Sequence, residues 1–209
     1  MKAHPEYWYV LFVPGYLLCF FLVEWLVPSD CDYWVSYCRL DDWIPFLEIF
    51  VIPYCCWYPL LLCVGVYLMI FDVPEFKRYM HFLILGFGVS LLFCLVFPNG
   101  QNLRPATFER ENLCTLLLGR LYAADTNTNV LPSMHVVGCI AASVAALRSN
   151  RLRRYSLPVI VISVLICLST VFVKQHSILD VFAAFVVALP IWWALYRRNG
   201  RKPKKDHKK

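Results

Sequence analysis

The sequence predicts an all-α polytopic membrane protein, a bundle of six transmembrane helices, from its composition and the spacing of its apolar runs. The chain of 209 residues is 60% hydrophobic but only 16% charged, whereas a soluble domain carries about 25% charged residues. Six spans of about 20 residues would use about 120 positions, which leaves no room for a separate soluble domain. The composition also excludes a secreted disulfide scaffold, a disordered protein and a nucleic-acid-binding protein.

Six apolar runs alternate with polar segments, at residues 7–27, 44–70, 80–97, 134–147, 157–173 and 178–196. The first is too long for the core of a signal peptide and no small-residue cleavage site follows it, so we expect it to remain as a span. The fourth, with about 14 residues, is long enough only if Leu131, Pro132 and Ser133 extend it. We expect one membrane domain over residues 1–196 and a basic tail over residues 197–209.

The Lys and Arg residues gather on one side of this topology. Fifteen of the 20 lie at the N-terminus, between the second and third runs, between the fourth and fifth, and after the sixth. Short loops rich in Lys and Arg stay in the cytoplasm, so both termini are expected there. The other five, in the loops expected outside, are Arg39, Arg104, Arg110, Arg120 and Lys174. The net charge of +6 therefore reflects topology and does not indicate a nucleic-acid partner.

Two histidines and an aspartate stand at span ends on the expected outer side. His176 and Asp180 are four residues apart, so on a helix they share one face and the carboxylate can accept a hydrogen bond from the imidazole. This pairing fixes the tautomer of the ring and stabilises positive charge on it, which makes His176 a candidate nucleophile. His135 is a candidate proton donor, because an imidazole both gives and takes protons near neutral pH.

Arg104, Lys174 and Ser133 lie on the same side and supply hydrogen-bond donors for an anion, Arg104 as a rigid fork matched to phosphate oxygens. The ten cysteines form no metal-ligand spacing, so neither a metal nor another cofactor is expected. Cys31 and Cys38, in the first outer loop, are candidates for a disulfide in an oxidising compartment. The combination of two histidines, a paired carboxylate and two cations indicates phosphoryl transfer through a phosphohistidine.

These residues resemble the three-part signature of the type 2 phosphatidic acid phosphatase (PAP2) superfamily, commonly written KxxxxxxRP, PSGH and SRxxxxxHxxxD. The order and the spacing agree, and the motifs fall within residues 97–180. The matching positions are Arg104 and Pro105, then Pro132, Ser133 and His135, then Ser169, His176 and Asp180.

The resemblance implies a six-helix membrane bundle with its active site at the extracytoplasmic face, and metal-independent removal or transfer of phosphate on a membrane lipid. It implies that His176 is the nucleophile, that His135 is the general acid and that Asp180 supports the nucleophile. Its conserved donors would place Arg104, Ser133 and Ser169 around the phosphate.

Three positions depart from the signature. Phe97 stands where the first motif has Lys, Met134 replaces the Gly of the second, and Thr170 replaces the Arg of the third. Lys174 is four residues beyond Thr170, hence on the same helical face, and we expect it to supply the missing charge. The segment around it is also similar to the branch that contains inositol phosphorylceramide synthase, whose members transfer the phospho-headgroup to an alcohol.

Three functions remain open from the sequence. The first is a lipid phosphate phosphatase that acts on phosphatidate, a polyprenyl diphosphate or a similar lipid, with water as acceptor. The second is a lipid phosphotransferase of the inositol phosphorylceramide synthase type. The third is a non-enzymatic anion channel or transporter, which would need polar residues through the midplane; Glu24 and Glu48 are the main acidic residues within the runs and do not outline a path. The lipid and the oligomeric state are not predicted.

Overall fold

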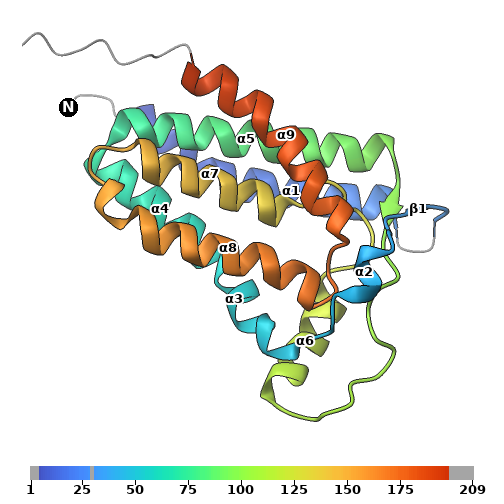
Figure 1. Cartoon of the computed structure of the whole chain (residues 1–209). Helices are drawn as coiled ribbons and strands as arrows, with labels where there is room; N and C mark the ends of the chain where they lie inside the picture. The colour runs from blue at the N-terminus through green and yellow to red at the C-terminus, as the bar shows by residue number, and fades with distance from the viewer. Residues whose placement is uncertain (1–4, 29–30, 198–209) are drawn as a thin grey trace, which may run out of the picture.

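The computed structural model describes residues 5–28 and 31–197 and shows an elongated helical bundle (Figure 1). Its α-helices in these segments are α1 (Phe12–Leu26), α2 (Leu40–Trp43), α3 (Val51–Cys55), α4 (Trp57–Phe71), α5 (Val73–Val96), α6 (Leu113–Ala124), α7 (Met134–Arg148), α8 (Ser156–Phe172) and α9 (Ile178–Tyr196). Short 3-10 helices occupy Pro5–Leu11, Glu48–Phe50 and Arg153–Tyr155. Strands β1 (Trp34–Val35) and β2 (Asn99–Gly100) pair in parallel, Trp34 opposite Asn99.

Five helical segments in the described residues are long and apolar enough to cross a membrane. They are Trp8–Leu26, Glu48–Phe71, Val73–Val96, Arg153–Phe172 and Ile178–Tyr196. They coincide with five of the six predicted runs, which confirms an all-α polytopic membrane fold. The remaining run forms α7, an apolar helix of 15 residues. At 1.5 Å per residue α7 is about 22 Å long, shorter than a hydrocarbon core of about 30 Å, so a count of six spans stays a prediction.

Two helices differ from the sequence prediction because capping side chains satisfy their first backbone N–H groups. Helix α5 begins at Val73 rather than at residue 80, since Asp72 accepts a hydrogen bond from the backbone of Glu75. Helix α6 lies in a segment expected as loop. Asn112 and Thr115 form a capping box at its start.

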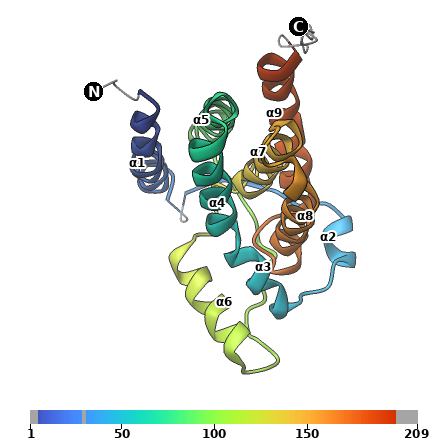
Figure 2. The same ribbon diagram turned by 90° about the vertical axis from the view of Figure 1, so that its left-hand side faces the viewer.

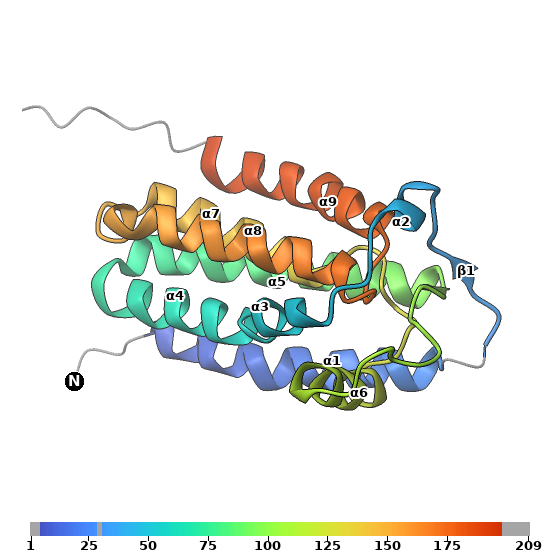
Figure 3. The same ribbon diagram turned by 60° about the horizontal axis from the view of Figure 1, so that its bottom comes forward.

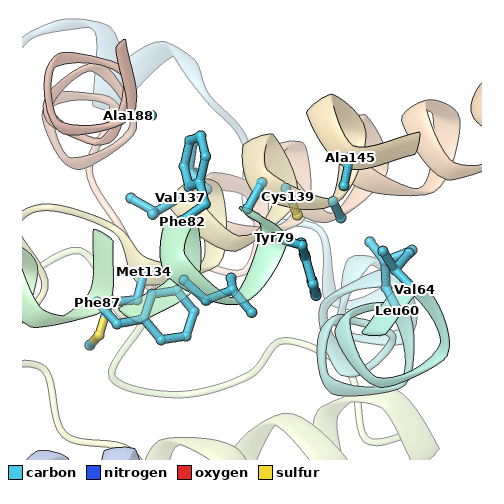
Figure 4. Close-up of a cluster of buried hydrophobic side chains, with 14 of the residues drawn as sticks. Leu60, Val64, Tyr79, Phe82, Phe87, Met134, Val137, Cys139, Ala145 and Ala188 are labelled. Atoms are coloured by element: carbon cyan, nitrogen blue, oxygen red, sulfur yellow. The ribbon is translucent and has the colours of Figure 1, made fainter. Parts of the chain in front are cut away.

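Helices α5 and α7 form the centre of the bundle. Figure 4 shows Tyr79, Phe82 and Phe87 of α5 among side chains of α4, α7 and α9. Helix α7 packs closely because its buried face is built from small residues, which let helix backbones approach in a membrane. These are Gly138, Ala141, Ala142, Ala145 and Ala146.

The two ends of the bundle differ in charge. At one end the connection after α4, the end of α7 and the end of α9 meet: Ser149 Oγ donates to Asp72 at 2.7 Å, Tyr196 OH donates to Glu75 at 2.7 Å, and the Arg148 guanidinium lies over the Tyr196 ring. The start of α1 lies at this end too (Figure 3). Its cations are Lys77, Arg78, Arg148, Arg151, Arg153, Arg154 and Arg197. The long connections that carry Arg39, Arg104 and Lys174 lie at the opposite end (Figure 1).

Helix α1 stands at the side of the bundle. It packs against α5 and is set apart from α4 (Figure 2). An apolar groove of about 810 Å³ runs between α1, α4 and α5.

The close contact between α5 and α7 gives a first prediction. A Cβ atom at Gly86 would stand 2.5 Å from Val137 Cγ1, whereas a Cβ atom at Gly88, two residues along the same helix, would meet nothing within 4 Å. We expect Gly86→Ala to lower the free energy of unfolding by about 1–3 kcal/mol relative to Gly88→Ala, the usual cost of overpacking. Thermal unfolding in detergent measures the difference, and equal midpoints would contradict the packing.

Candidate active site

His176 and Asp180 meet at the N-terminus of α9. His176 Nδ1 lies 3.2 Å from Asp180 Oδ2, and the same oxygen accepts the backbone N–H of Ser177 at 3.0 Å. Ser177 is the N-cap of α9 and forms a capping box with Asp180. His176 therefore precedes the helix, so the capping geometry of this turn brings the two side chains together. Nδ1 is held by the carboxylate, and Nε2 is the ring nitrogen that remains for a substrate.

Two buried carboxylates hold this turn. Asp180 is fully buried and its Oδ1 accepts a hydrogen bond from Ser36 Oγ. Asp41, also buried, accepts hydrogen bonds from Ser177 Oγ at 2.7 Å and from the backbone N–H of Ile178 at 2.8 Å. The positive end of the α9 dipole favours both negative charges. The connection between α1 and α3 thus fixes the turn that carries His176.

His135 faces His176 from the start of α7. The two ring centroids are 5.5 Å apart. The His135 ring lies between Tyr54, at 4.5 Å, and Trp57, at 4.4 Å between centroids, and Trp57 Nε1 donates to the His135 carbonyl at 3.1 Å. This aromatic packing restricts the orientation of the imidazole.

Both histidines line a pocket of about 240 Å³, whose polar wall includes Asp125 and Gln175. Asp125 Oδ2 accepts hydrogen bonds from Tyr54 OH at 3.3 Å and from Gln175 Nε2 at 3.1 Å. Burial raises the pKa of Asp125, while the nearby charges of His176 and Arg104 lower it. The pocket has room for a phosphate group beside the two imidazoles.

Arg104 stands behind this wall. Its Nη atoms donate to the backbone carbonyls of Tyr122, Asp125 and Thr126 and to Gln175 Oε1, and its guanidinium lies over the Tyr122 ring. Burial lowers the pKa of Arg104 and the charge of Asp125 raises it. Its buried Nε has no hydrogen-bond partner in the described part of the chain.

The two predicted serines differ in their surroundings. Ser133 is the N-cap of α7; its buried Oγ makes no hydrogen bond to the residues that the structure describes, while its backbone N–H donates to the Asp180 carbonyl at 3.1 Å. Ser169 Oγ donates to the Ile166 carbonyl of its own helix at 2.6 Å. Ser133 thus has a hydroxyl group without a partner in the described residues beside the Asp180 turn, and neither serine lines the pocket.

Lys174 is not where the sequence suggested. It follows the end of α8 and has a φ of 54°, so it does not continue the helical face of Thr170. Its Nζ donates to the carbonyls of Asp41 at 2.9 Å and Ile44 at 2.6 Å, away from the pocket. The expectation that Lys174 replaces the third-motif Arg assumed an unbroken helix. The cation instead holds the connection between α1 and α3 in place.

Sequence reasoning missed several residues of this site. Ser36 and Asp41 belong to no recognisable motif, and only the folded chain brings them to α9. Asp125 is an ionisable residue in the motif-bearing loop, a signal that could have singled it out. Cys31 and Cys38 are free thiols in the structure. No group of three or more His, Cys, Asp or Glu residues in segments 5–28 and 31–197 could hold a metal ion.

The placement of Lys174 gives a second prediction. Lys174→Met removes two charge-assisted hydrogen bonds from a buried position, each worth about 1.5–3 kcal/mol. We expect a clearly lower unfolding midpoint in detergent. The control is Arg39→Met, which removes an exposed cation from the connection between α1 and α3; its free energy of unfolding should stay within about 0.5 kcal/mol of the wild type. A Lys174→Met protein as stable as Arg39→Met would refute the structural role.

A comparison with protein families agrees with the motifs. The family model described as the PAP2 superfamily matches residues 81–204, more than half of the chain. No curated protein and no solved structure matches the chain. The matched region contains His135, His176 and Asp180. The chain therefore belongs to the PAP2 superfamily, a membership that supports a phosphatase or phosphotransferase type of activity on lipid phosphates.

Proposed function

We propose that this protein is a metal-independent lipid phosphate phosphatase that works through a phosphohistidine on His176. The observation that carries the proposal is that two cavities adjoin. The pocket that holds His135 and His176 shares Tyr16, Leu17, Trp57 and Tyr58 with the apolar groove between α1, α4 and α5. A polar site for a phosphate therefore adjoins space suited to hydrocarbon.

The dimensions of the groove favour a lipid over a soluble phosphate ester. It is lined almost wholly by apolar side chains of the membrane-spanning helices and has a volume of about 810 Å³. Burial of each methylene group there contributes about 0.8 kcal/mol. A phosphatidate or a polyprenyl diphosphate would place its phosphate between the histidines and a hydrocarbon chain along α4.

The reaction proceeds in two halves at one site. His176 Nε2 attacks phosphorus, the bond from phosphorus to the lipid oxygen breaks, and His135 gives its proton to the departing oxygen. Asp180 stabilises the positive charge on the substituted ring through Nδ1. Water then attacks phosphorus, the P–N bond breaks with its electron pair returning to the ring, and His135 takes the proton from water.

Two donors without partners in the described residues support an anion site. They are Arg104 Nε and Ser133 Oγ, both buried. An unpaired buried donor is costly. Neither residue lines the pocket; Arg104 lies behind its polar wall and Ser133 beside the Asp180 turn. Ser133 also stands at the N-terminus of α7, where backbone N–H groups and the helix dipole favour an anion. Lys174 and Ser169 have no direct part in this arrangement.

We further propose the orientation. The end of the bundle that carries Lys77, Arg78 and Arg148–Arg154 faces the cytoplasm, because cytoplasmic loops are rich in Lys and Arg. The active site then lies at the extracytoplasmic face, and α7 is the sixth span. Both termini would be cytoplasmic; Lys2 and the basic residues after Arg197 lie outside the described residues.

The test uses purified protein in detergent micelles with labelled phosphatidate and a labelled polyprenyl diphosphate. We expect His176→Ala to abolish phosphate release and His135→Ala to reduce it by about 100-fold or more, the usual contribution of a general acid. His81→Ala is the matched control, since His81 is exposed on α5, bonds Tyr9 and the Lys77 carbonyl, and does not line the pocket. Phosphate release by His176→Ala at the wild-type rate would contradict the mechanism.

The products decide between hydrolysis and transfer. Mass spectrometry of the reaction with and without added alcohols distinguishes free phosphate, expected for a phosphatase, from a new phosphodiester, expected for a phosphotransferase of the inositol phosphorylceramide synthase type.

A further inference from the structure

Asp125 occupies a position that local physical chemistry disfavours. It is the C-cap of α6, where the negative end of the helix dipole opposes a carboxylate. It is partly buried, and no ion pair joins it to a cation in the described segments. A carboxylate kept in such surroundings marks a functional site. The three signature motifs do not include Asp125.

The hydrogen bonds to the Asp125 carboxylate all go to one of its two oxygens in the described residues. Tyr54 OH and Gln175 Nε2 both donate to Oδ2, and Oδ1 has no partner among the residues that the structure describes. The carboxylate lines the same pocket as His135 and His176. The protein therefore orients the group through one oxygen and leaves the other to a ligand in the pocket.

The ligand of Oδ1 must carry a hydrogen-bond donor. A fully ionised phosphate offers only acceptor oxygens, so the phosphoryl group that is transferred to His176 is a poor partner for Oδ1. The second half of the proposed reaction brings in a molecule that carries O–H groups, the acceptor of the phosphoryl group. We propose that Asp125 forms the acceptor subsite, where Oδ1 accepts a hydrogen bond from the acceptor molecule that attacks the phosphohistidine. This inference rests on the proposed function.

The subsite also restricts the class of acceptor. The attacking oxygen forms a bond to phosphorus, the P–N bond to His176 breaks with its electron pair returning to Nε2, and the attacking O–H gives its proton to His135. A second O–H of the same molecule donates to Asp125. Water has two O–H groups and a polyol has several, whereas a simple alcohol has one. Burial, which raises the pKa of Asp125, makes its carboxylate a stronger hydrogen-bond acceptor.

Asp125→Asn is the decisive variant. The Asn side-chain oxygen can still accept hydrogen bonds from Tyr54 and Gln175, while an NH₂ group replaces the oxygen that faces the pocket. The matched control is Glu24→Gln. Glu24 is also a partly buried carboxylate, held by Thr126 and Asn129, but it does not line the pocket.

The experiment follows labelled phosphate from phosphatidate onto the protein after rapid denaturation at alkaline pH, which preserves phosphohistidine. For Asp125→Asn we expect labelling of His176 at close to the wild-type rate and loss of the label slowed about tenfold or more, the factor that one hydrogen bond to a charged group supplies. Labelled enzyme then accumulates. Glu24→Gln should label and lose label as the wild type does.

A second measurement adds glycerol or ethanol at equal concentration to the wild type. We expect glycerol to compete with water better than ethanol does, with any transfer product being glycerol phosphate. We expect the Asn variant to lose this preference. Preferred formation of ethyl phosphate by the wild type would overturn the two-donor subsite.

Two further results would overturn the role of Asp125. One is loss of label from Asp125→Asn at the wild-type rate. The other is labelling slowed as much as overall turnover, which would place Asp125 in the first half of the reaction or in folding. Failure of the proposed function has a different signature, since the wild type would then release phosphate without any label that His176→Ala removes.

Discussion

The candidate active site depends on two buried carboxylates that accept hydrogen bonds at the N-terminus of α9. Asp180 and Asp41 are almost completely excluded from solvent, and an unpaired carboxylate in such a place would be costly. Each is satisfied by N–H and O–H donors of the same turn, Ser177 among them. Asp180 also accepts a hydrogen bond from Ser36, which lies in the connection between α1 and α3. His176 is part of this turn, so its imidazole is oriented before a substrate arrives.

The same arrangement joins segments that are far apart in the chain. Lys174 Nζ binds the carbonyls of Asp41 and Ile44, and the carbonyl of Lys174 in turn accepts a hydrogen bond from Gln101 Nε2 at 3.0 Å. Strands β1 and β2 pair the segment between α1 and α2 with the segment that follows α5. The polar end of the bundle is therefore held by hydrogen bonds, whereas α5 and α7 are held by close apolar packing. Hydrogen bonds thus position the candidate catalytic side chains, whereas apolar packing holds the apolar helices together.

The sequence predicted what depends on local pattern. Apolar runs located five of the membrane-spanning segments, and the signature located the two histidines that the fold brings within 5.5 Å of each other. It failed where the backbone changes direction. Lys174 was assigned to the face of Thr170 by helical periodicity, but the helix ends between them. Asp125 belongs to no periodic pattern in the sequence. The fold brings two hydrogen-bond donors to it, Tyr54 from α3 and Gln175 from the turn before α9.

The length of α7 relates its fixed C-terminal end to the position of His135. Its C-terminal end is fixed at the basic end of the bundle, where Ser149 binds Asp72. With 15 residues it extends about 22 Å from that point, less than the hydrocarbon thickness of about 30 Å. In the proposed orientation, with the C-terminal end of α7 at the cytoplasmic boundary of the hydrocarbon core, His135, at its second position, lies below the outer boundary of that core. A longer helix would raise His135 into water and away from Tyr16 and Trp57, where the pocket joins the apolar groove. The length of α7 thus sets the level at which a phosphate and a hydrocarbon chain can be bound together.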